Sequence, residues 1–398
     1  MHSKPWISRT ALIIAGAAFL LAGCGGGGGG GGGSDAPVQA SSTAATTQAA
    51  VAALNVDFGN LPDYTTTLPA HYASAAALDN TPAGAVSKKE VATLGRVLFY
   101  DRRLSLNDTK SCASCHQQST DFADIDRFSM GFAGTDRTTA HSMRLANLRF
   151  WQPGSMFWDR RAASLETQSV MPIQHPVEMG FDASNGGMTV LVDKLRSITY
   201  YPELFTLAFG DGTVTEERMQ LALAQYMRSI VSVNSRWDSA YAQVFNPSLP
   251  DKGLSLPAPG LTEQEDRGRH LFMNFPSKGG MSCAACHVPP TFALKGTTQS
   301  NGLDEGETKI FKSPSLKNVA NSGAFMHDGR FSTLEEVVEH YATGVKDGPA
   351  LDKNMRGPDG LPRLRPVTPD DKAALVAFLK TLSDPVLAAD PRFSDPFR

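Results

Sequence analysis

The sequence predicts a mostly α-helical protein that contains two similar domains in tandem. The first observation is an internal repeat, because residues 94–116 and 267–287 both combine a helical apolar pattern, a polar loop and the motif Cys-x-x-Cys-His. The second is an amphipathic helical pattern that closes each copy, at residues 215–233 and 368–382. The third is that no alternation of apolar and polar residues indicates strands.

The N-terminal region of the chain has the features of an export signal. Lys4 and Arg9 precede an apolar run at residues 11–22, which is shorter than the roughly 20 residues that a membrane-spanning helix needs. The run ends in Leu-Ala-Gly-Cys, which is similar to a bacterial lipobox, where the cysteine becomes the lipidated first residue. We therefore expect residues 1–23 to be a lipoprotein signal peptide and Cys24 to anchor a periplasmic protein to a membrane.

The division of the remaining chain follows from its composition. Nine consecutive glycines follow Cys24, and small or polar residues come next, so residues 24–57 are predicted to be a flexible tether. About 340 residues remain, which is more than one hydrophobic core usually holds. A stretch rich in proline and glycine at residues 246–260 separates the two copies of the repeat. The predicted domains are residues 58–250 and 251–398.

Charge and cysteine usage exclude two classes of protein. The chain has 37 basic and 40 acidic side chains and a formal net charge of −3, so it lacks the basic excess that indicates nucleic-acid binding. Of the five cysteines, four lie in the repeated motifs and the fifth is Cys24. No thiol is left to build a disulfide framework.

The repeated motif indicates covalently bound haem. In Cys-x-x-Cys-His, two thiols on one helical turn reach the vinyl groups of one porphyrin, and the histidine coordinates the iron. A single copy would also suit a redox dithiol or half of a zinc site, but two copies within a repeat of an exported chain favour haem. The attachment residues are then Cys112, Cys115 and His116, and Cys283, Cys286 and His287, with the two histidines as proximal iron ligands. The predicted fold is mostly α, with two tandem cytochrome c-like domains that each carry one c-type haem and face each other across an interdomain interface.

Two further segments accompany the haem motifs. Residues 157–162 read Phe-Trp-Asp-Arg-Arg-Ala, and residues 325–330 read Phe-Met-His-Asp-Gly-Arg. With these segments, the chain resembles the bacterial di-haem cytochrome c peroxidase family, which includes MauG, over about residues 88–382. The resemblance implies that the first haem reacts with hydrogen peroxide, that the second transfers electrons, and that Trp158 lies between them. From the residues alone, a tryptophan such as Trp158 is more often a buried core side chain, and its place in the motif is what favours the bridging role.

The resemblance also assigns a peroxide pocket. Peroxide chemistry needs a carboxyl group that takes a proton from the bound oxygen and returns it to the leaving oxygen. Glu178 matches that position, and its mostly apolar neighbours would raise its pKa by burial. Gln168 would hydrogen-bond the peroxide, and Pro172 would restrict the pocket. Without the resemblance, Glu178 reads as a surface charge, and the other two as ordinary helix or loop residues.

One position decides whether the first iron has a vacant site. Many family members have a second histidine sixteen residues after the proximal one, and the same count from His116 leads to Phe132. Phenylalanine cannot bind iron, so the first haem is predicted to be five-coordinate and to react with peroxide without prior reduction. His141 is the nearest alternative ligand.

A second position decides the chemistry of the other haem. Ordinary members have a methionine fourteen residues after the histidine of the His-Asp-Gly segment, and the count from His327 leads to Tyr341, as in MauG. A phenolate stabilises ferric iron, whereas a thioether favours ferrous iron. Tyr341 is therefore the expected ligand of the second haem, and His340 and Met326 are the alternatives.

Two departures from the family bear on the site. The family usually has glycine where Arg160 stands, so this side chain either pairs with a haem propionate or distorts the turn. The family also holds a calcium ion between its domains. The resemblance places that ion near His141, Ser322 and Ala324, which are not its usual ligands.

Three functions remain, each with two haems. The first is a MauG-like oxidase that uses hydrogen peroxide to oxidise a protein or aromatic partner. The second is a cytochrome c peroxidase that removes peroxide with electrons from a small periplasmic cytochrome or copper protein. The third is an electron carrier without turnover. Phe132 and Tyr341 favour the first over the second, and the predicted peroxide pocket opposes the third.

Overall fold

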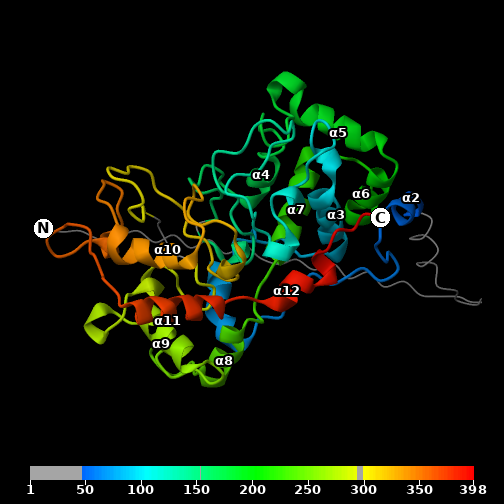
Figure 1. The fold of residues 1–398 in the computed structure, drawn as a ribbon. Coiled ribbons are helices and arrows are strands. Elements are labelled where there is room, and N and C mark those ends of the chain that lie inside the picture. Colours follow the sequence, from blue (N-terminus) through cyan, green and yellow to red (C-terminus); the bar gives the residue numbers. More distant parts are fainter. Residues whose placement is uncertain (1–46, 153, 294–298) are drawn as a thin grey trace, which may run out of the picture. The chain divides into compact units, whose positions relative to one another are not determined.

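The described part of the protein is mostly helical, as predicted. The computed structural model describes residues 47–152, 154–293 and 299–398 (Figure 1). The predicted signal peptide, Cys24 and most of the predicted tether lie outside these residues. Within them, helices are joined by long loops, and the extended segments pair only as isolated bridges. None of the helices in these ranges combines the length and the apolar character that crossing a membrane requires.

The α-helices fall into two groups along the chain. The first group is α2 (Gln48–Ala53), α3 (Lys89–Tyr100), α4 (Leu165–Val170), α5 (Gly187–Ser197), α6 (Tyr200–Phe209) and α7 (Glu216–Ser229). The second group is α8 (Arg236–Val244), α9 (Glu263–Met273), α10 (Leu334–Glu339), α11 (Pro369–Lys380) and α12 (Pro385–Ala389). The two helices predicted to close the repeats are thus α7 and α11.

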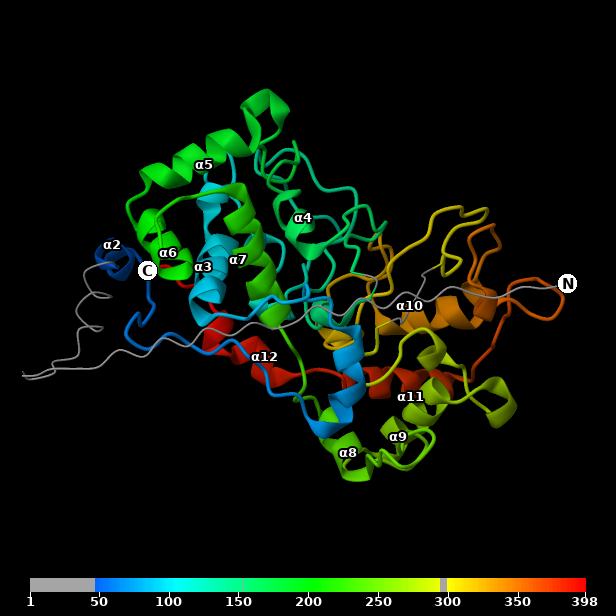
Figure 2. The same cartoon turned by 180° about the vertical axis from the view of Figure 1, so that it is seen from behind.

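Each half contains the same close crossing of two helices. In the first half α3 packs against α7, and in the second α9 packs against α11 (Figures 1 and 2). A Cβ atom added at Gly95 of α3 would lie 2.0 Å from the carbonyl oxygen of Ala222. A Cβ atom added at Gly268 of α9 would lie 1.9 Å from the carbonyl oxygen of Ala374. The glycine shared by both copies of the repeat is therefore what lets each helix pair approach so closely.

The repeat extends well beyond the haem motifs. Residues with left-handed backbone occur in matching pairs: Phe122 and Phe292 (φ 63° and 54°), Asn147 and Asn318 (61° and 63°), Phe157 and Met326 (69° and 72°), and Arg160 and Gly329 (both 61°). The bridge between Met156 and Ala162 matches the bridge between Phe325 and Phe331. Trp158 and His327 therefore occupy equivalent positions in two copies of one turn.

Arg160 keeps the conformation of that turn rather than distorting it. Its φ of 61° equals that of Gly329 in the other copy, although a side chain in the left-handed region costs roughly 1–2 kcal/mol. Its Nε donates a hydrogen bond to Ser155 Oγ at 3.0 Å, within the same turn. The sequence left open whether this residue distorts the turn, and the backbone shows that it does not.

The two larger hydrophobic cores do not divide at residue 250, where the sequence places the domain boundary. Trp237 and Tyr241 on α8 belong to the second core, whereas Leu387 and Phe393 near the C-terminus belong to the first. The rings of Trp237 and Tyr241 stack with centroids 5.1 Å apart, and this aromatic face draws α8 into the second core. The chain thus passes between the cores before α8 and returns to the first core at its end.

The helix α2 lies inside the segment predicted to be a flexible tether. The carboxylate of Glu203 on α6 accepts hydrogen bonds from the amides of Ala49 and Ala50 at 3.1 and 2.9 Å. These amides begin the helix and would otherwise lack acceptors. Leu54, just after α2, is buried and bridges to Phe397, and the C-terminus lies beside α2 (Figures 1 and 2). Composition alone did not predict this helix, because the helix depends on partners from distant parts of the chain.

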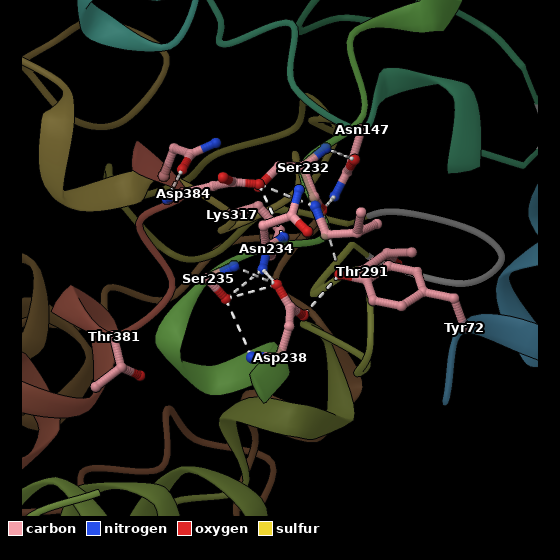
Figure 3. Close-up of polar contacts among 12 residues, drawn as sticks. Tyr72, Asn147, Ser232, Asn234, Ser235, Asp238, Thr291, Lys317, Thr381 and Asp384 are labelled. Carbon is pink, nitrogen blue, oxygen red and sulfur yellow. Dashed lines mark hydrogen bonds and ion pairs between the residues drawn. The ribbon is translucent and has the colours of Figure 1, made fainter. Parts of the chain in front are cut away.

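A buried polar network holds the segment that passes between the cores (Figure 3). Asp384 accepts hydrogen bonds from Ser232 Oγ and from the amides of Val233 and Asn234, at 2.9–3.1 Å. Lys317 donates to Ser235 Oγ at 2.6 Å and forms an ion pair with Asp238. Burial disfavours ionised Asp238, but the Lys317 ammonium group outweighs burial and holds the pKa of that carboxyl well below its usual range.

Candidate functional site

The first Cys-x-x-Cys-His motif forms one tight helical turn. The 3-10 helix Cys112–Ser114 begins it, and the amide of His116 donates to the carbonyl oxygen of Cys112 at 2.9 Å. Burial raises the pKa of Cys112 to about 12 and that of Cys115 to about 11. The Nδ1 atom of His116 lies 3.1 Å from the carbonyl oxygen of Phe122. Since a carbonyl only accepts, Nδ1 carries the proton and Nε2 is left for a metal ion.

The second motif repeats this geometry beside a cavity of about 250 Å³. His287 Nδ1 lies 3.3 Å from the carbonyl oxygen of Phe292, so its Nε2 is also left for a metal ion. Cys283, Cys286 and His287 all line the cavity. Two thiols and one imidazole nitrogen around an apolar cavity are the donor set of a covalently bound haem, and the residues therefore fit that cofactor.

Tyr341 lines the same cavity as His287. It lies in a π-helical turn, His340–Gly344, that directly follows α10. Such turns interrupt α-helices mostly at functional sites. Burial raises the pKa of Tyr341 to about 12, so the phenol is neutral at ordinary pH. Binding to ferric iron would have to release its proton, as metal ligation does in general.

The alternative ligands differ in position. Met326 lines the cavity, and Asn301 Nδ2 donates both to its Sδ at 3.4 Å and to Tyr341 Oη at 3.3 Å. His340 Nε2 lies 3.1 Å from the carbonyl oxygen of Asn301 and donates a hydrogen bond to it. Met355 also lines the cavity. The positions of Asn301 and Met355 at this cavity could not be recognised from the sequence, because nothing in their local sequence indicates proximity to the haem motif.

Glu178 lies close to the first haem motif. Its charge raises the pKa of both Cys112 and Cys115, which places the carboxylate within electrostatic reach of the two thiols. Burial raises the pKa of Glu178 itself, while His175 and Arg161 oppose that rise. His175 Nδ1 lies 3.8 Å from Glu178 Oε1 and was not recognised from the sequence. A polar residue three positions before the carboxylate was the only available signal.

Phe132 packs against the loop that carries Glu178. The amide of Phe132 donates to the carbonyl oxygen of Val177 at 3.1 Å. A Cβ atom added at Gly180 would lie 2.6 Å from the Phe132 ring, so ring and loop are in direct contact. The side chain at the position of the family's second histidine is therefore beside the predicted peroxide pocket.

Gln168 and Pro172 lie on the segment that leads to Glu178. Gln168 is on α4, and Pro172 follows two residues after the helix ends. Glu166 on α4 pairs with Arg228 on α7 at 2.5 Å, which fixes the helix against the first core. Both predicted residues are half-buried.

The turn that carries Trp158 reaches both haem sites. Trp158 lines the second cavity, and its Nε1 donates to the carbonyl oxygen of His141 at 2.8 Å. The amide of His141 in turn donates to the carbonyl oxygen of His327 at 2.9 Å. Arg161, three residues after Trp158, lowers the pKa of Glu178 beside the first motif. His141 also lines the second cavity.

The residues expected to hold calcium do not fit that ion. Ser322 Oγ accepts a hydrogen bond from Arg144 Nη1 at 2.9 Å, so a guanidinium stands where a divalent cation would bind. His141 Nδ1 lies 3.2 Å from the carbonyl oxygens of Asp126 and Arg127 and donates there. In the described ranges, no cluster of three or more Asp, Glu, His or Cys side chains is placed to hold a metal ion.

The fold and the two motifs define a class of enzyme. The chain belongs to the di-haem cytochrome c peroxidase family, whose model matches residues 89–244 and 262–354. It is therefore an oxidoreductase of the peroxidase type, with two cytochrome c-like domains and haem c cofactors.

Individual relatives come from two branches of that family. MauG of Methylorubrum extorquens is 32% identical over 311 residues, which are 74% of this chain and 78% of that protein. Cytochrome c551 peroxidase of Nitrosomonas europaea is 29% identical over 319 residues, 74% of this chain and 80% of that protein. Among solved structures, a MauG-like protein associated with microbial copper homeostasis matches with a TM-score of 0.64 and 28% identity, over 85% of this chain and 99% of that one.

Proposed function

We propose that the protein reacts with hydrogen peroxide at the first haem site and uses the second to oxidise a protein or aromatic partner, as a MauG-like enzyme. The observation that carries this proposal is Tyr341 in the cavity of the second haem motif. When bound, the two haems supply the iron centres at which peroxide is reduced and oxidising equivalents are held. The protein's own residues transfer protons, leave the first haem site open to peroxide and connect the two sites.

Glu178 is the proton-transfer group of the first site. Its pKa is raised by burial toward the working pH, which suits a group that must both accept and return a proton. Gln168 and Pro172 shape the pocket on the segment before it. Phe132, packed against the Glu178 loop, supplies no metal ligand and so leaves the first site open to peroxide.

Tyr341 and Trp158 set the role of the second site. An anionic oxygen ligand favours the oxidised states of iron, so this haem would share oxidising equivalents rather than store an electron. Trp158 lines the same cavity, and its turn extends to Arg161 near Glu178. These contacts support Trp158 as the bridge between the sites.

The alternative is a cytochrome c peroxidase that removes peroxide with electrons from a small periplasmic redox protein. Met326 and Met355 favour this function, because either thioether in the cavity would stabilise ferrous iron. Addition of stoichiometric peroxide to the diferric protein separates the two. The MauG-like function requires an immediate change in the haem absorption spectrum without reductant. If only the half-reduced protein reacts, the proposal is wrong.

The ligand of the second haem is tested by substitution. Tyr341→Phe should change the low-spin EPR signal of the diferric protein, because the oxygen ligand is lost. Tyr241→Phe is the matched control. Tyr241 is buried in the second core, and its hydroxyl donates to the backbone carbonyl oxygen of Lys252. An EPR signal that changes in Met326→Leu instead of Tyr341→Phe would assign the thioether.

The protein is further proposed to act in the periplasm, held to a membrane by lipid on Cys24. The proposal rests on residues 1–24 and on the covalent haem motifs. In cells, Cys24→Ser should abolish labelling by radioactive palmitate and release the protein from the membrane fraction. Labelling that persists in this variant would exclude Cys24 as the anchor.

A further inference from the structure

Arg144 lies between the two halves of the protein with one donor unused. Its Nη1 donates to Ser322 Oγ at 2.9 Å, and its Nη2 donates to the carbonyl oxygen of Ser315 at 3.3 Å. Its Nε is buried and has no hydrogen-bond partner in the described ranges. Both partners belong to the second half, whereas Arg144 belongs to the first. A buried guanidinium donor without an acceptor in the protein indicates a partner that the protein does not supply, such as water or an anion.

The charge of Arg144 acts on groups in both halves. The side chain lines the cavity of the second haem motif, where its charge adds to the effect of burial in lowering the pKa of His287. In the loop after the first motif, burial raises the pKa of Asp121 to about 6, and the charge of Arg144 opposes that rise. Burial lowers the pKa of Arg144 itself to about 10, so it remains charged at neutral pH.

A second buried basic side chain, Lys312, lines the same cavity, and burial lowers its pKa to about 7. Lys312 Nζ lies 3.5 Å from Met156 Sδ and 5.2 Å from the centre of the Trp151 ring. Neither Lys312 nor Arg144 forms an ion pair within the described part of the chain. Among the residues that line this cavity, the carboxylate of Asp352 stands against the basic side chains of Arg144, Lys312, Arg363 and Arg365, so positive charge is in excess. The two propionate groups that every haem carries are anions of the right kind to balance it.

We propose that Arg144 is the cation between the two haems, that its Nε binds a haem propionate, and that it takes the place of a calcium ion. Ser322, at the expected calcium position, already accepts from this guanidinium. The positive charge of Arg144 would repel a divalent cation beside Ser322. Lys312 lines the same cavity. The proposal requires only that both haems are bound, and it is independent of the peroxide chemistry proposed above.

Metal analysis of the wild-type holoprotein is the first test. After dialysis against calcium and then against metal-free buffer, the protein should contain no stoichiometric calcium. Its absorption and EPR spectra should be unchanged by the chelator EGTA. One calcium ion per chain, whose removal alters the haem spectra, would overturn the proposal. No substitution is needed, so the result does not depend on a variant that folds.

Reduction potentials measured by spectroelectrochemistry provide the second test. Arg144→Gln removes a positive charge and should favour ferric over ferrous iron at the second haem by about tenfold, which is about 59 mV toward negative potential for one electron. Arg144→Lys keeps the charge and should recover most of the wild-type potential. Arg196→Gln is the matched control, because Arg196 is an exposed partner of Asp193 on α5. Wild-type potentials at both haems in Arg144→Gln would overturn the proposal.

Discussion

In the proposed function, the chemistry of the first site depends most directly on the Glu178 carboxyl. Burial raises its pKa, while His175 and Arg161 act in the opposite direction. Glu178 must be ionised to take the first proton from peroxide, so the reaction should slow as pH falls through the raised pKa. Stopped-flow absorption of the diferric protein, mixed with peroxide across a pH series, measures this dependence.

Substitution of Glu178 tests the same role at fixed pH. Glu178→Gln should slow the reaction with peroxide by about 10²-fold and remove the pH dependence, since the amide cannot accept the proton. Glu217→Gln is the control, because Glu217 is an exposed side chain in the first turn of α7. A near-native rate in Glu178→Gln would return Glu178 to the role of a surface charge.

Among single residues, the sequence predicted those whose proposed role depends on local spacing. The haem cysteines and histidines follow from one helical turn, whereas Glu178 was assigned by the resemblance to the family. Asn301 could not be predicted, because it approaches Tyr341 only after the chain has folded, from forty residues away. His175 was missed for a different reason. Its proximity to Glu178 depends on the path of an irregular loop.

Among the elements, the segment that passes between the cores depends on one buried ion pair. Lys317 and Asp238 are both fully or nearly fully buried. Lys317→Met should lower the free energy of unfolding by about 3–5 kcal/mol, because it leaves the Asp238 carboxylate buried without its cation. Lys372→Met breaks an exposed pair with Glu339 and should cost less than about 1 kcal/mol. Denaturant unfolding of the holoprotein gives both values, and equal losses would contradict the predicted role.

The elements also show where sequence patterns succeed and fail. Periodicity located α7 and α11 within a few residues, because their apolar faces pack on α3 and α9. It could not show the π-helical turn at His340–Gly344, since one extra residue in a helical turn leaves no mark on composition. The equivalence of the turns at Trp158 and His327 was not recognised from the sequence either, because only Asp and Arg are shared between them and the matching backbone angles appear only in the structure.

For the whole molecule, the C-terminal residues are part of the first core. Phe393 is 1% exposed and lies 6.0–6.3 Å, between ring centres, from Tyr64, Phe122 and Tyr226. Phe393→Ala should therefore destabilise the protein by about 3–5 kcal/mol. Phe275→Ala is the control, since Phe275 is 64% exposed. Thermal unfolding monitored at the haem absorption band measures the difference, and similar melting temperatures for both variants would contradict this prediction.

The return of the C-terminal segment to the first core has a consequence for the order of assembly. A chain made from its N-terminus usually completes its first domain first. Here the first core lacks Leu387 and Phe393 until the last few residues of the chain have been added. The half that contains the first haem motif therefore starts to fold early but finishes last, after the half that follows it. A chain that ended before Leu387 would therefore leave the first core incomplete.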